Sequence, residues 1–422
     1  MQLVVQFVSY DSPEDVGGVS SWLRKALSRL REQGIDARVD LFCFSGKPGA
    51  NAAWYQKNNV PFRWSPWLDD TQSAVRQCLL WLKEDMPQVY VPNCILPAYF
   101  AAAEARRCGA RTIGVLHSDD PFYWGLVDEF VLGGKQWRLD ELVVVSRFLH
   151  DALPSNSTSM MRVHEIPCGV TIPQSLATRP TGKFRLIYTG RLVEEQKRTS
   201  DLARALCRVA REHSDVEGWI VGSGEAETNM RNIIRMEGME TRVILKGRVD
   251  HDSIHEVLKE CHVFVLLSDY EGTPVSLLEA MSVGLVPICL ETRSGVGEVI
   301  SHMRNGILVR DRENAFSNAL SYLISNPEAW SAFSAEARRT IAERYSEEGC
   351  MEKWKTLLLA LPVSVSNSRE PRQRLRLPPR NPKFGHYDQR SSPFSKNWSR
   401  IRIRLGSYRR EMLKLFCGTP KG

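Results

Sequence analysis

The stretch FRLIYTGRLVEEQKRTSDLARALCRVAREHSDVEGWIVGSG, residues 184–224, decides the fold class of this chain. Two short apolar runs, at 184–190 and 217–224, enclose a segment with helical periodicity. A strand, a helix and a second strand in that order are typical of a parallel sheet covered by helices. The same alternation continues through most of the chain, so we predict an α/β fold.

Apolar runs of this kind predict ten strands in two groups of five. They lie at 3–9, 37–44, 88–93, 111–117 and 141–146, and then at 184–190, 217–224, 242–247, 262–268 and 286–291. The groups are separated by IPCGVTIPQSLATRPTG, residues 166–182, which is rich in Pro, Gly, Ser and Thr and has no sustained period. We therefore predict two Rossmann-like domains joined by a linker, with a ligand in the cleft at the carboxyl ends of the strands.

The positive charge of the chain is concentrated at its end. Residues 364–422 contain fifteen Lys or Arg and three Asp or Glu, a net charge of +12 in a chain whose total is +7, so the first 363 residues carry −5. The segment at 365–385 is rich in Pro and Arg and predicts an extended or disordered chain. An amphipathic helix is predicted at 398–416, because apolar residues there recur every three or four positions. These are Trp398, Ile401, Leu405, Tyr408, Met412 and Leu415.

The basic tail at 364–422 suits an anionic membrane surface, where each Lys or Arg contributes about 1 kcal/mol. A helix packed on the acidic body, or a charge run without function, fits the same pattern. The ten cysteines form no Cys-x-x-Cys pair, which favours a reduced cytoplasmic protein. The N-terminal MQLVVQFVSYDSPED predicts a first strand rather than a signal peptide, and no run reaches the ~20 apolar residues of a membrane-spanning helix. We expect a cytoplasmic protein, with peripheral attachment to the inner face of the plasma membrane as an alternative, and no nucleic-acid partner.

The turn TGRLVEEQKR, residues 189–198, places two cations after a strand. Arg191 and Lys197 lie between the strand that ends at Gly190 and the next helix, so their charges can converge above the strand end. Positive charge beside helix N-terminal amides suits a diphosphate without a metal. Two basic residues in such a loop also occur as a solvated surface, so the pattern alone leaves both interpretations open.

Two glutamates lie eight positions apart in SDYEGTPVSLLEAMSVGLVPI, residues 268–288. Glu271 precedes a helix predicted at 275–283 and Glu279 lies in its second turn, so both carboxylates can face the cleft. The start of this helix offers backbone N–H groups to a ligand oxygen. The residues at this start are Gly272, Thr273, Pro274 and Val275. A surface acid followed by a capping or ion-paired acid would give the same spacing.

A histidine ends the predicted strand RTIGVLH and begins HSDDPFYW, residues 117–124. A single histidine at a strand end is commonly a satisfied polar residue, although His117 is followed by two acids and three aromatic residues. Aromatic faces suit the apolar faces of sugar rings. These residues could therefore form a surface on which a sugar acceptor binds, or they could equally belong to the hydrophobic core. The candidates are Asp119, Phe122, Tyr123 and Trp124.

Together these motifs closely resemble glycosyltransferase family 4, whose members have the GT-B fold. The run EGTPVSLLEAMSVGLVPI, followed by SGVGEVISHMRNGILV, resembles the C-terminal signature of that family. GRLVEEQK, VGSGEAE and GRVDHDSIHEVLKECHVFVLLS match it in order and spacing, as do DVGGVSSW and VVVSRF with IPCGV in the first half. The resemblance covers roughly residues 1–360, and the long ordered set of matches makes it specific.

The resemblance implies a GT-B architecture with two Rossmann-like domains facing across a cleft and a basic C-terminal tail. The implied parts are an acceptor-side domain at 1–168, a linker at 169–182, a nucleotide-sugar-binding domain at 183–345, a helix at 346–363 that crosses back to the first domain, and the tail at 364–422.

The resemblance also implies a role for each site residue. Glu271 is expected to hold hydroxyls of the donor sugar, and Glu279 the ribose diol of the nucleotide. Arg191 and Lys197 are expected on the donor diphosphate, and His117 near the reacting carbon of the sugar. The further donor contacts are Gly272, Thr273, Pro274 and Val275, Gly190, Arg248 and Val249 beside the nucleobase, and the glycine loop of Gly17 and Gly18.

The implied activity is retaining transfer of a hexose-type sugar from a UDP- or GDP-linked donor to an unknown acceptor. A cell-envelope polysaccharide, a lipopolysaccharide or a lipid-linked glycan would suit. No protein nucleophile is evident, so we favour front-face attack in which the departing phosphate helps to deprotonate the acceptor. No metal or other cofactor is expected. Arg198, where the family has Gly, and Cys168, where it has Asn, put donor preference in question.

Three other functions fit parts of the sequence. A GT-B nucleotide-sugar epimerase needs only donor and water. A dinucleotide-dependent oxidoreductase also has two Rossmann-like domains, although SYDSPEDVGGVSSW lacks the G-x-G-x-x-G fingerprint. A non-catalytic binding protein with a membrane-associating tail is the third, and the matches at Glu271, Glu279, Arg191 and Lys197 argue against it.

Overall fold

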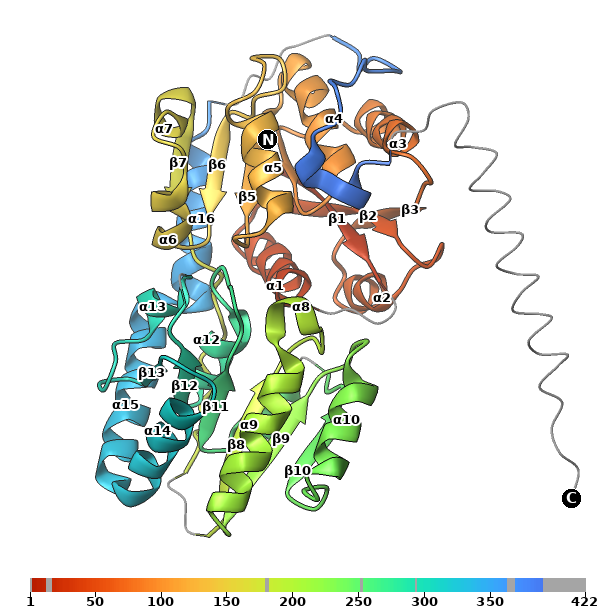
Figure 1. Cartoon of the computed structure of the whole chain (residues 1–422). Coiled ribbons are helices and arrows are strands. Elements are labelled where there is room, and N and C mark those ends of the chain that lie inside the picture. Colours follow the sequence, from red (N-terminus) through yellow and green to blue (C-terminus); the bar gives the residue numbers. More distant parts are fainter. Residues whose placement is uncertain are drawn as a thin grey trace, which may run out of the picture.

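Two parallel β-sheets covered by helices form the two halves of the molecule (Figure 1). The computed structural model describes residues 2–12, 17–178, 182–250, 253–292, 294–362 and 369–389, without the side chain of His386. Within these ranges no helix is long and apolar enough to cross a membrane.

The first sheet has the strand order β3-β2-β1-β4-β5-β6-β7, and each of its pairs is parallel. Its strands are β1 (Val4–Asp11), β2 (Asp36–Cys43), β3 (Phe62–Pro66), β4 (Val89–Pro92), β5 (Arg111–Leu116), β6 (Glu141–Val144) and β7 (Arg162–Glu165). The order reverses between β1 and β4, and in such sheets ligands bind at the carboxyl ends of the strands near the reversal.

The second sheet has the order β10-β9-β8-β11-β12-β13 and is also parallel throughout. Its strands are β8 (Phe184–Thr189), β9 (Val216–Val221), β10 (Val243–Gly247), β11 (Val263–Leu266), β12 (Val286–Leu290) and β13 (Ile307–Val309). Its order reverses between β8 and β11, so the loops after these two strands meet at one point of the cleft.

Helices cover both sheets. Those of the first half are α1 (Gly18–Glu32), α2 (Ala50–Lys57), α3 (Thr71–Glu84), α4 (Leu96–Arg107), α5 (Pro121–Phe130), α6 (Arg147–Ala152) and α7 (Ser157–Met160). Those that follow are α8 (Glu194–Lys197), α9 (Thr199–Glu212), α10 (Glu227–Met236), α11 (Ile254–Leu258), α12 (Val275–Ser282), α13 (Val296–Val299), α14 (Asn314–Ser325), α15 (Pro327–Arg344) and α16 (Glu347–Ala360). In α9 the buried Leu202, Leu206 and Val209 recur at the helical period and so face the sheet.

The prediction of five strands in each group was wrong, because three strands were missed. They are β3, β7 and β13, and each lies at an edge of its sheet. An edge strand has one solvent-facing side and carries polar residues, as RVHE does in β7, so it lacks the continuous apolar run that marked the others. β13 is only three residues long.

The two sheets have separate hydrophobic cores, and α16 belongs to the first. This helix follows α15 of the second half, but Trp354 packs on Trp22 and Phe7 of the first, with ring centroids 5.8 and 6.3 Å apart. Arg29 of α1 also donates to Glu347 at 2.6 Å. Helix α16 therefore brings the chain back to the first half, where it lies against α1 (Figure 1).

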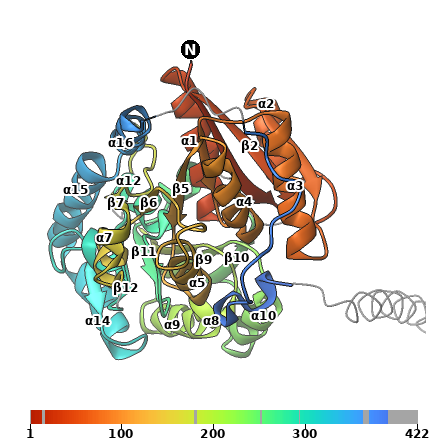
Figure 2. The same cartoon turned by 90° about the horizontal axis from the view of Figure 1, so that it is seen from above.

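An extended or disordered chain was predicted at 365–385. Residues 365–368 lie outside the described residues, 369–381 contain neither helix nor strand, and the prediction was wrong where a 3-10 helix begins at Pro382. Residues 369–389, which we call the strap, run over α3, α4 and α5 and end in a short 3-10 helix, η2 (Pro382–Tyr387) (Figure 2). Leu375 and Phe384 of the strap are buried in the first core. The prediction rested on the Pro- and Arg-rich composition of the segment, which gave no weight to these two apolar residues. The helix predicted at 398–416 lies outside the described residues.

Candidate functional site

The predicted phosphate cations and the first glutamate come together at the carboxyl edge of the second sheet. Lys197 ends α8, in the turn after β8, and Glu271 lies in the loop after β11. Because β8 and β11 are neighbours, these two turns lie side by side. Lys197 Nζ forms an ion pair with Glu271 Oε1, and their side chains are only 12% and 7% exposed.

A third side chain completes this contact. The amide of Gln196 donates to the carbonyl of Tyr270 at 3.0 Å and to Glu271 Oε2 at 3.5 Å. Its oxygen also accepts from the exposed guanidinium of Arg191 at 3.3 Å. Gln196 thereby links Arg191 to Glu271, which pairs directly with Lys197. Sequence reasoning missed Gln196, although it adjoins Lys197 in the same turn.

Arg198, which follows Lys197, has left-handed backbone torsions of φ 50° and ψ 48°. It ends α8 and begins α9 at the same residue. A glycine adopts this conformation without the steric penalty that a Cβ brings. An arginine in place of the family's glycine therefore adds backbone strain at this position, and it leaves the charge of Lys197 unaffected.

Glu279 lies in α12 and is buried, and Lys25 of α1 approaches its Oε1 to 3.9 Å. The start of α12 also meets the first half, because a Cβ on Gly18 would lie 3.3 Å from Val275. The first N–H groups of a helix have no acceptor within that helix. α12 thus presents its positive end beside the glycine loop of Gly17 and Gly18.

The two halves touch through their backbones at Gly272. A Cβ on Gly272 would lie 2.1 Å from the carbonyl oxygen of His117, so only glycine permits this approach. The hydroxyl of Thr273 donates to the carbonyl of Val145 at 3.0 Å, and this bond occupies its side chain. These contacts place His117 directly opposite the loop that carries Glu271.

The tautomer of His117 is fixed by a partner that the sequence did not reveal. His117 Nε2 lies 2.7 Å from Oδ1 of Asn93, an acceptor, so Nε2 carries the proton. Burial lowers the pKa of His117 to about 3, and the ring is neutral at physiological pH. Its Nδ1 is buried without a hydrogen-bond partner among the described residues, which leaves an acceptor for a ligand hydroxyl.

The aromatic residues after His117 do not form a single open platform. Tyr123 is a core residue, 7% exposed, with its hydroxyl 2.9 Å from Cys94 Sγ, and burial raises its pKa well above the usual value. Trp124 donates to Asp119 at 2.6 Å. Phe122 is half-buried against η2, with its ring 4.9 Å from that of Tyr387. These side chains belong mainly to the packing of α5.

The remaining predicted donor residues line the same edge. Gly190 directly follows β8, where its Cβ position would fall 2.8 Å from the hydroxyl of Tyr188. Arg248 is exposed and Val249 half-buried after β10, two strands away from β8. Cys168, the second departure from the family, is buried in the first core.

A carboxylate of the second half caps a helix of the first. Glu298 of α13 accepts hydrogen bonds from the backbone N–H groups of Arg147, at 2.9 Å, and Phe148, at the start of α6. Burial raises the pKa of Glu298, while these two bonds oppose the shift. Sequence reasoning quoted this segment but assigned Glu298 no role, because its partners are backbone groups of the other half.

Comparison with known proteins agrees with this arrangement. The family described as Glycosyltransferase Family 4 matches residues 16–172, and the family described as Glycosyl transferases group 1 matches residues 175–340. The two matches follow one another across both halves of the fold. The chain belongs to glycosyltransferase family 4. Its architecture is accordingly GT-B.

Relatives and a solved structure support the family and the fold. An uncharacterized glycosyltransferase of Haemophilus influenzae is 30% identical over 151 residues, 36% of this chain and 42% of the relative. The poly(ribitol-phosphate) α-N-acetylglucosaminyltransferase of Staphylococcus aureus is 27% identical over 150 residues, 35% of this chain and 30% of the relative. This chain therefore matches less than half the length of either relative. HepE of Anabaena, solved with UDP and glucose, has a TM-score of 0.67 at 18% identity and covers 84% of this chain and 99% of its own.

Proposed function

We propose that this protein is a retaining hexosyltransferase that transfers a sugar from a UDP-linked donor to a glycan or lipid-linked acceptor. The observation that supports it best is the buried Lys197–Glu271 pair beside Arg191, facing His117 of the other half. The family of the chain and the UDP and glucose in the structure of HepE agree with such a donor. A GDP-linked donor is the alternative that the same site would accept.

On the donor side, Arg191 and Lys197 hold the diphosphate together with the amides at the start of α12. Glu271 accepts hydrogen bonds from the sugar hydroxyls, and Glu279 from the ribose diol. Positive charge held at these positions stabilises the phosphate as its bond to the sugar breaks. We propose that this charge replaces a metal ion.

On the reacting side, we propose front-face attack. The acceptor hydroxyl gives its proton to the departing phosphate as the new bond to the anomeric carbon forms, and configuration is retained. His117 contributes its unprotonated Nδ1 as an acceptor for a hydroxyl of the donor sugar, because Asn93 holds the proton on Nε2. A neutral ring also avoids adding charge beside a developing cation.

Incubation with UDP, GDP and their sugar conjugates tests the donor assignment. Titration calorimetry is expected to show binding of UDP that Lys197→Met weakens by about ten-fold or more. Lys183→Met provides the control. Lys183 directly precedes β8, at the end of the strand opposite Lys197, and its 63% exposed side chain forms an ion pair with Glu217. Equal affinity of wild type and Lys197→Met would contradict the site.

Three further measurements test the chemistry. The anomeric coupling of the product in proton NMR separates retention from inversion. An unchanged rate in EDTA supports metal-independent transfer, and loss of the rate contradicts it. Acceptor-free conversion of the donor to its epimer would replace the proposal by an epimerase.

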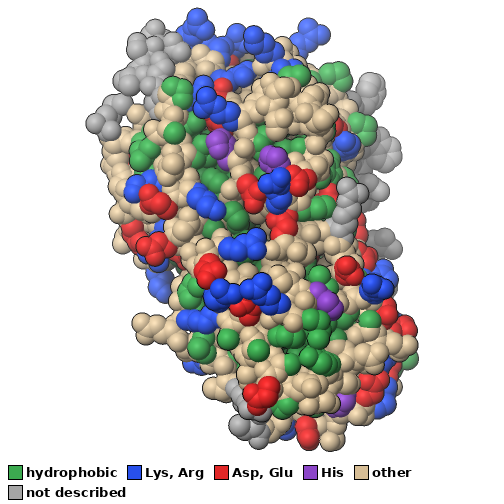
Figure 3. Space-filling view, turned by 90° about the vertical axis from the view of Figure 1, so that its left-hand side faces the viewer, with side chains coloured by type: hydrophobic (Ala, Val, Ile, Leu, Met, Phe, Trp, Pro, Cys, Tyr) green, Lys and Arg blue, Asp and Glu red, His purple; other side chains and the backbone are tan. Residues whose placement is uncertain are grey.

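We also propose that the basic tail contacts an anionic membrane. Figure 3 shows Lys and Arg side chains gathered at the end of the molecule formed by the first half. In the strap, Arg372, Arg374, Arg376 and Arg380 are exposed while Leu375 is buried. Flotation with phosphatidylserine vesicles tests this by comparing the full chain with a chain truncated after Gln389. An earlier truncation would also remove Phe384, which is buried in the first core. Equal flotation of both chains contradicts a role for residues 390–422.

A further inference from the structure

Gln196 connects the two loops that form the donor edge of the second sheet. It lies in α8, after β8, and is partly buried. Its backbone carbonyl accepts from the N–H of Asp269 at 3.0 Å, and its side-chain amide donates to the carbonyl of Tyr270 at 3.0 Å. The same amide nitrogen donates to Glu271 Oε2 at 3.5 Å. Gln196 therefore contacts three consecutive residues of the loop after β11.

The oxygen of the same amide holds a cation. Gln196 Oε1 accepts from the guanidinium of Arg191 at 3.3 Å. Among the residues that the structure describes, this is the only hydrogen bond or ion pair of that guanidinium, which is otherwise exposed. A guanidinium has several N–H groups, so those that do not face Gln196 stay available to phosphate oxygens. Gln196 thus orients Arg191 and leaves most of its donors free for an anion.

The orientation of the Gln196 amide is fixed by its neighbours. Its oxygen faces the donors of Arg191, and its nitrogen faces the carbonyl of Tyr270 and the carboxylate of Glu271. The reverse orientation would place donor against donor and acceptor against acceptor. A carboxylate at this position would repel Glu271, and an apolar side chain would leave both sides without a partner. An amide of this length suits both sides at once.

Side chains that are already held in place bind a ligand at a lower entropic cost. A free arginine loses most of its rotamer freedom when it binds an anion, and an existing hydrogen bond reduces that loss. Both oxygens of Glu271 are also held, because Lys197 pairs with Oε1 while Gln196 donates to Oε2. The cation expected on the diphosphate and the carboxylate expected on the sugar are thus connected through one side chain.

We propose that Gln196 is a positioning residue that couples recognition of the donor diphosphate to recognition of the donor sugar. It holds Arg191 through Oε1, and it holds Glu271 and its loop through Nε2. This inference rests on the proposed function, because the roles of Arg191 and Glu271 are taken from there. It adds a residue that acts on the donor through these two others.

Titration calorimetry of the full chain tests the coupling, with UDP, UDP-glucose, UDP-galactose and UDP-N-acetylglucosamine as probes. Gln196→Met keeps the length of the side chain and removes both of its hydrogen-bonding groups. We expect it to weaken UDP binding about ten-fold, because Arg191 is released. The ratio of the Kd of UDP to that of the tightest-binding UDP-sugar measures what the sugar adds. This ratio is expected to fall about three-fold or more, because Glu271 loses its support.

Arg191→Met separates the two effects of Gln196. It is expected to weaken UDP binding and to leave the ratio unchanged, whereas Gln196→Met lowers both. The double variant Arg191→Met with Gln196→Met should bind UDP no more weakly than Arg191→Met alone, because Gln196 acts on the diphosphate through Arg191. A purely structural role would instead give losses of UDP affinity that add.

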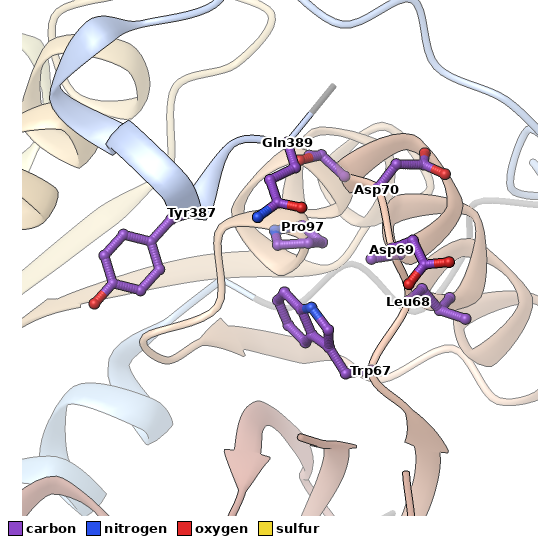
Figure 4. A pocket seen from close by; sticks show the side chains of 9 residues that line it. Trp67, Leu68, Asp69, Asp70, Pro97, Tyr387 and Gln389 are labelled. Carbon is purple, nitrogen blue, oxygen red and sulfur yellow. The ribbon is translucent and has the colours of Figure 1, made fainter. Parts of the chain in front are cut away.

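Two glutamines of the first half and the strap provide matched controls. Gln72 donates to the carbonyl of Leu375 at 3.2 Å, the same kind of bond that Gln196 makes to a loop carbonyl. Gln389 is exposed and lies at a hollow between the strap and the turn after β3, which has room for about one water molecule (Figure 4). Gln72→Met and Gln389→Met are expected to bind UDP and the UDP-sugars like wild type.

The results distinguish failure of the coupling from failure of the proposed function. Wild type that binds neither UDP nor the three UDP-sugars overturns the proposed UDP-linked donor, and this inference with it. If wild type binds them, three results overturn the coupling alone. They are a Gln196→Met variant that binds UDP like wild type, an unchanged ratio in that variant, and additive losses in the double variant. Equal losses in the two control variants would likewise overturn it, because the effect would then be a general disturbance.

Discussion

Lys197 and Glu271 form a nearly buried ion pair that joins the turns after two neighbouring strands, β8 and β11. Each charge is compensated by the other, so both side chains are held in position in the absence of a ligand. Removing either partner affects stability as well as chemistry, because it leaves one charge buried and unpaired.

Lys197→Met is expected to lower the free energy of unfolding by about 3 kcal/mol, as breaking a buried pair does. The double variant Lys197→Met with Glu271→Gln should recover at least ~1 kcal/mol of this loss, because no charge is then left unpaired. Transfer is expected to fall about 100-fold or more in both variants. Denaturant unfolding and initial rates measure the two effects. Recovery of activity together with stability would show that the pair is only structural.

Gly272→Ala should hold the halves of the molecule apart, because its Cβ would fall 2.1 Å from the carbonyl oxygen of His117. We expect the transfer rate to fall at least ten-fold and the radius of gyration from solution scattering to rise. UDP affinity should change less, since Arg191 and Lys197, which we propose to hold the diphosphate, both lie within the second half. Gly297→Ala is the control, because its Cβ meets no atom within 4 Å. Normal transfer by Gly272→Ala would mean that this contact is not required.

Arg198→Gly is expected to raise the melting temperature by about 2–4 °C, because glycine relieves the left-handed backbone at φ 50°. The ion pairs of Arg198 with Asp201 and Asp269 are partly exposed and should offset little of this gain. Calorimetry of both proteins at the same pH measures it. A lower melting temperature would show that those pairs outweigh the backbone strain.

His117 should make the fold sensitive to acid. Burial lowers its pKa to about 3 from an ordinary value near 6.5, so between these pH values the unfolded chain binds a proton that the folded chain does not. The free energy of unfolding therefore falls as the pH falls through this window. Replacing His117 by Gln is expected to lessen the loss between pH 7.5 and pH 5.0 by up to about 2 kcal/mol.

Denaturant titrations of wild type and His117→Gln at both pH values measure this difference. His262, whose pKa burial lowers to about 4, titrates in the same window in both proteins and cancels in the comparison. NMR of the His117 ring provides a second observation, since its shifts should not change between pH 5 and pH 8. Equal acid sensitivity of the two proteins would contradict the assignment.

The sequence by itself determined the fold class and the two groups of strands, and it predicted that Arg191, Lys197 and Glu271 lie in turns at one edge of the second sheet. Buried parallel strands require continuous apolar runs, and these remain visible in sequence wherever both faces of a strand are covered. The positions of Arg191, Lys197 and Glu271 could be predicted for a related reason, because they lie in turns that follow such runs, and their role in donor binding stays a prediction. The edge strands β3, β7 and β13 were missed because they are short or have a solvent-facing side.

Only the tertiary structure decided which groups meet across the chain. Asn93 fixes the tautomer of His117, and Glu298 caps a helix of the other half, through contacts between distant residues. The strap shows the same limit, since Phe384 is buried in a segment whose composition favours disorder. The local spacing of apolar residues predicts which side of a helix or strand is buried against its own sheet. Contacts between elements far apart in sequence depend on packing geometry, which no local period records.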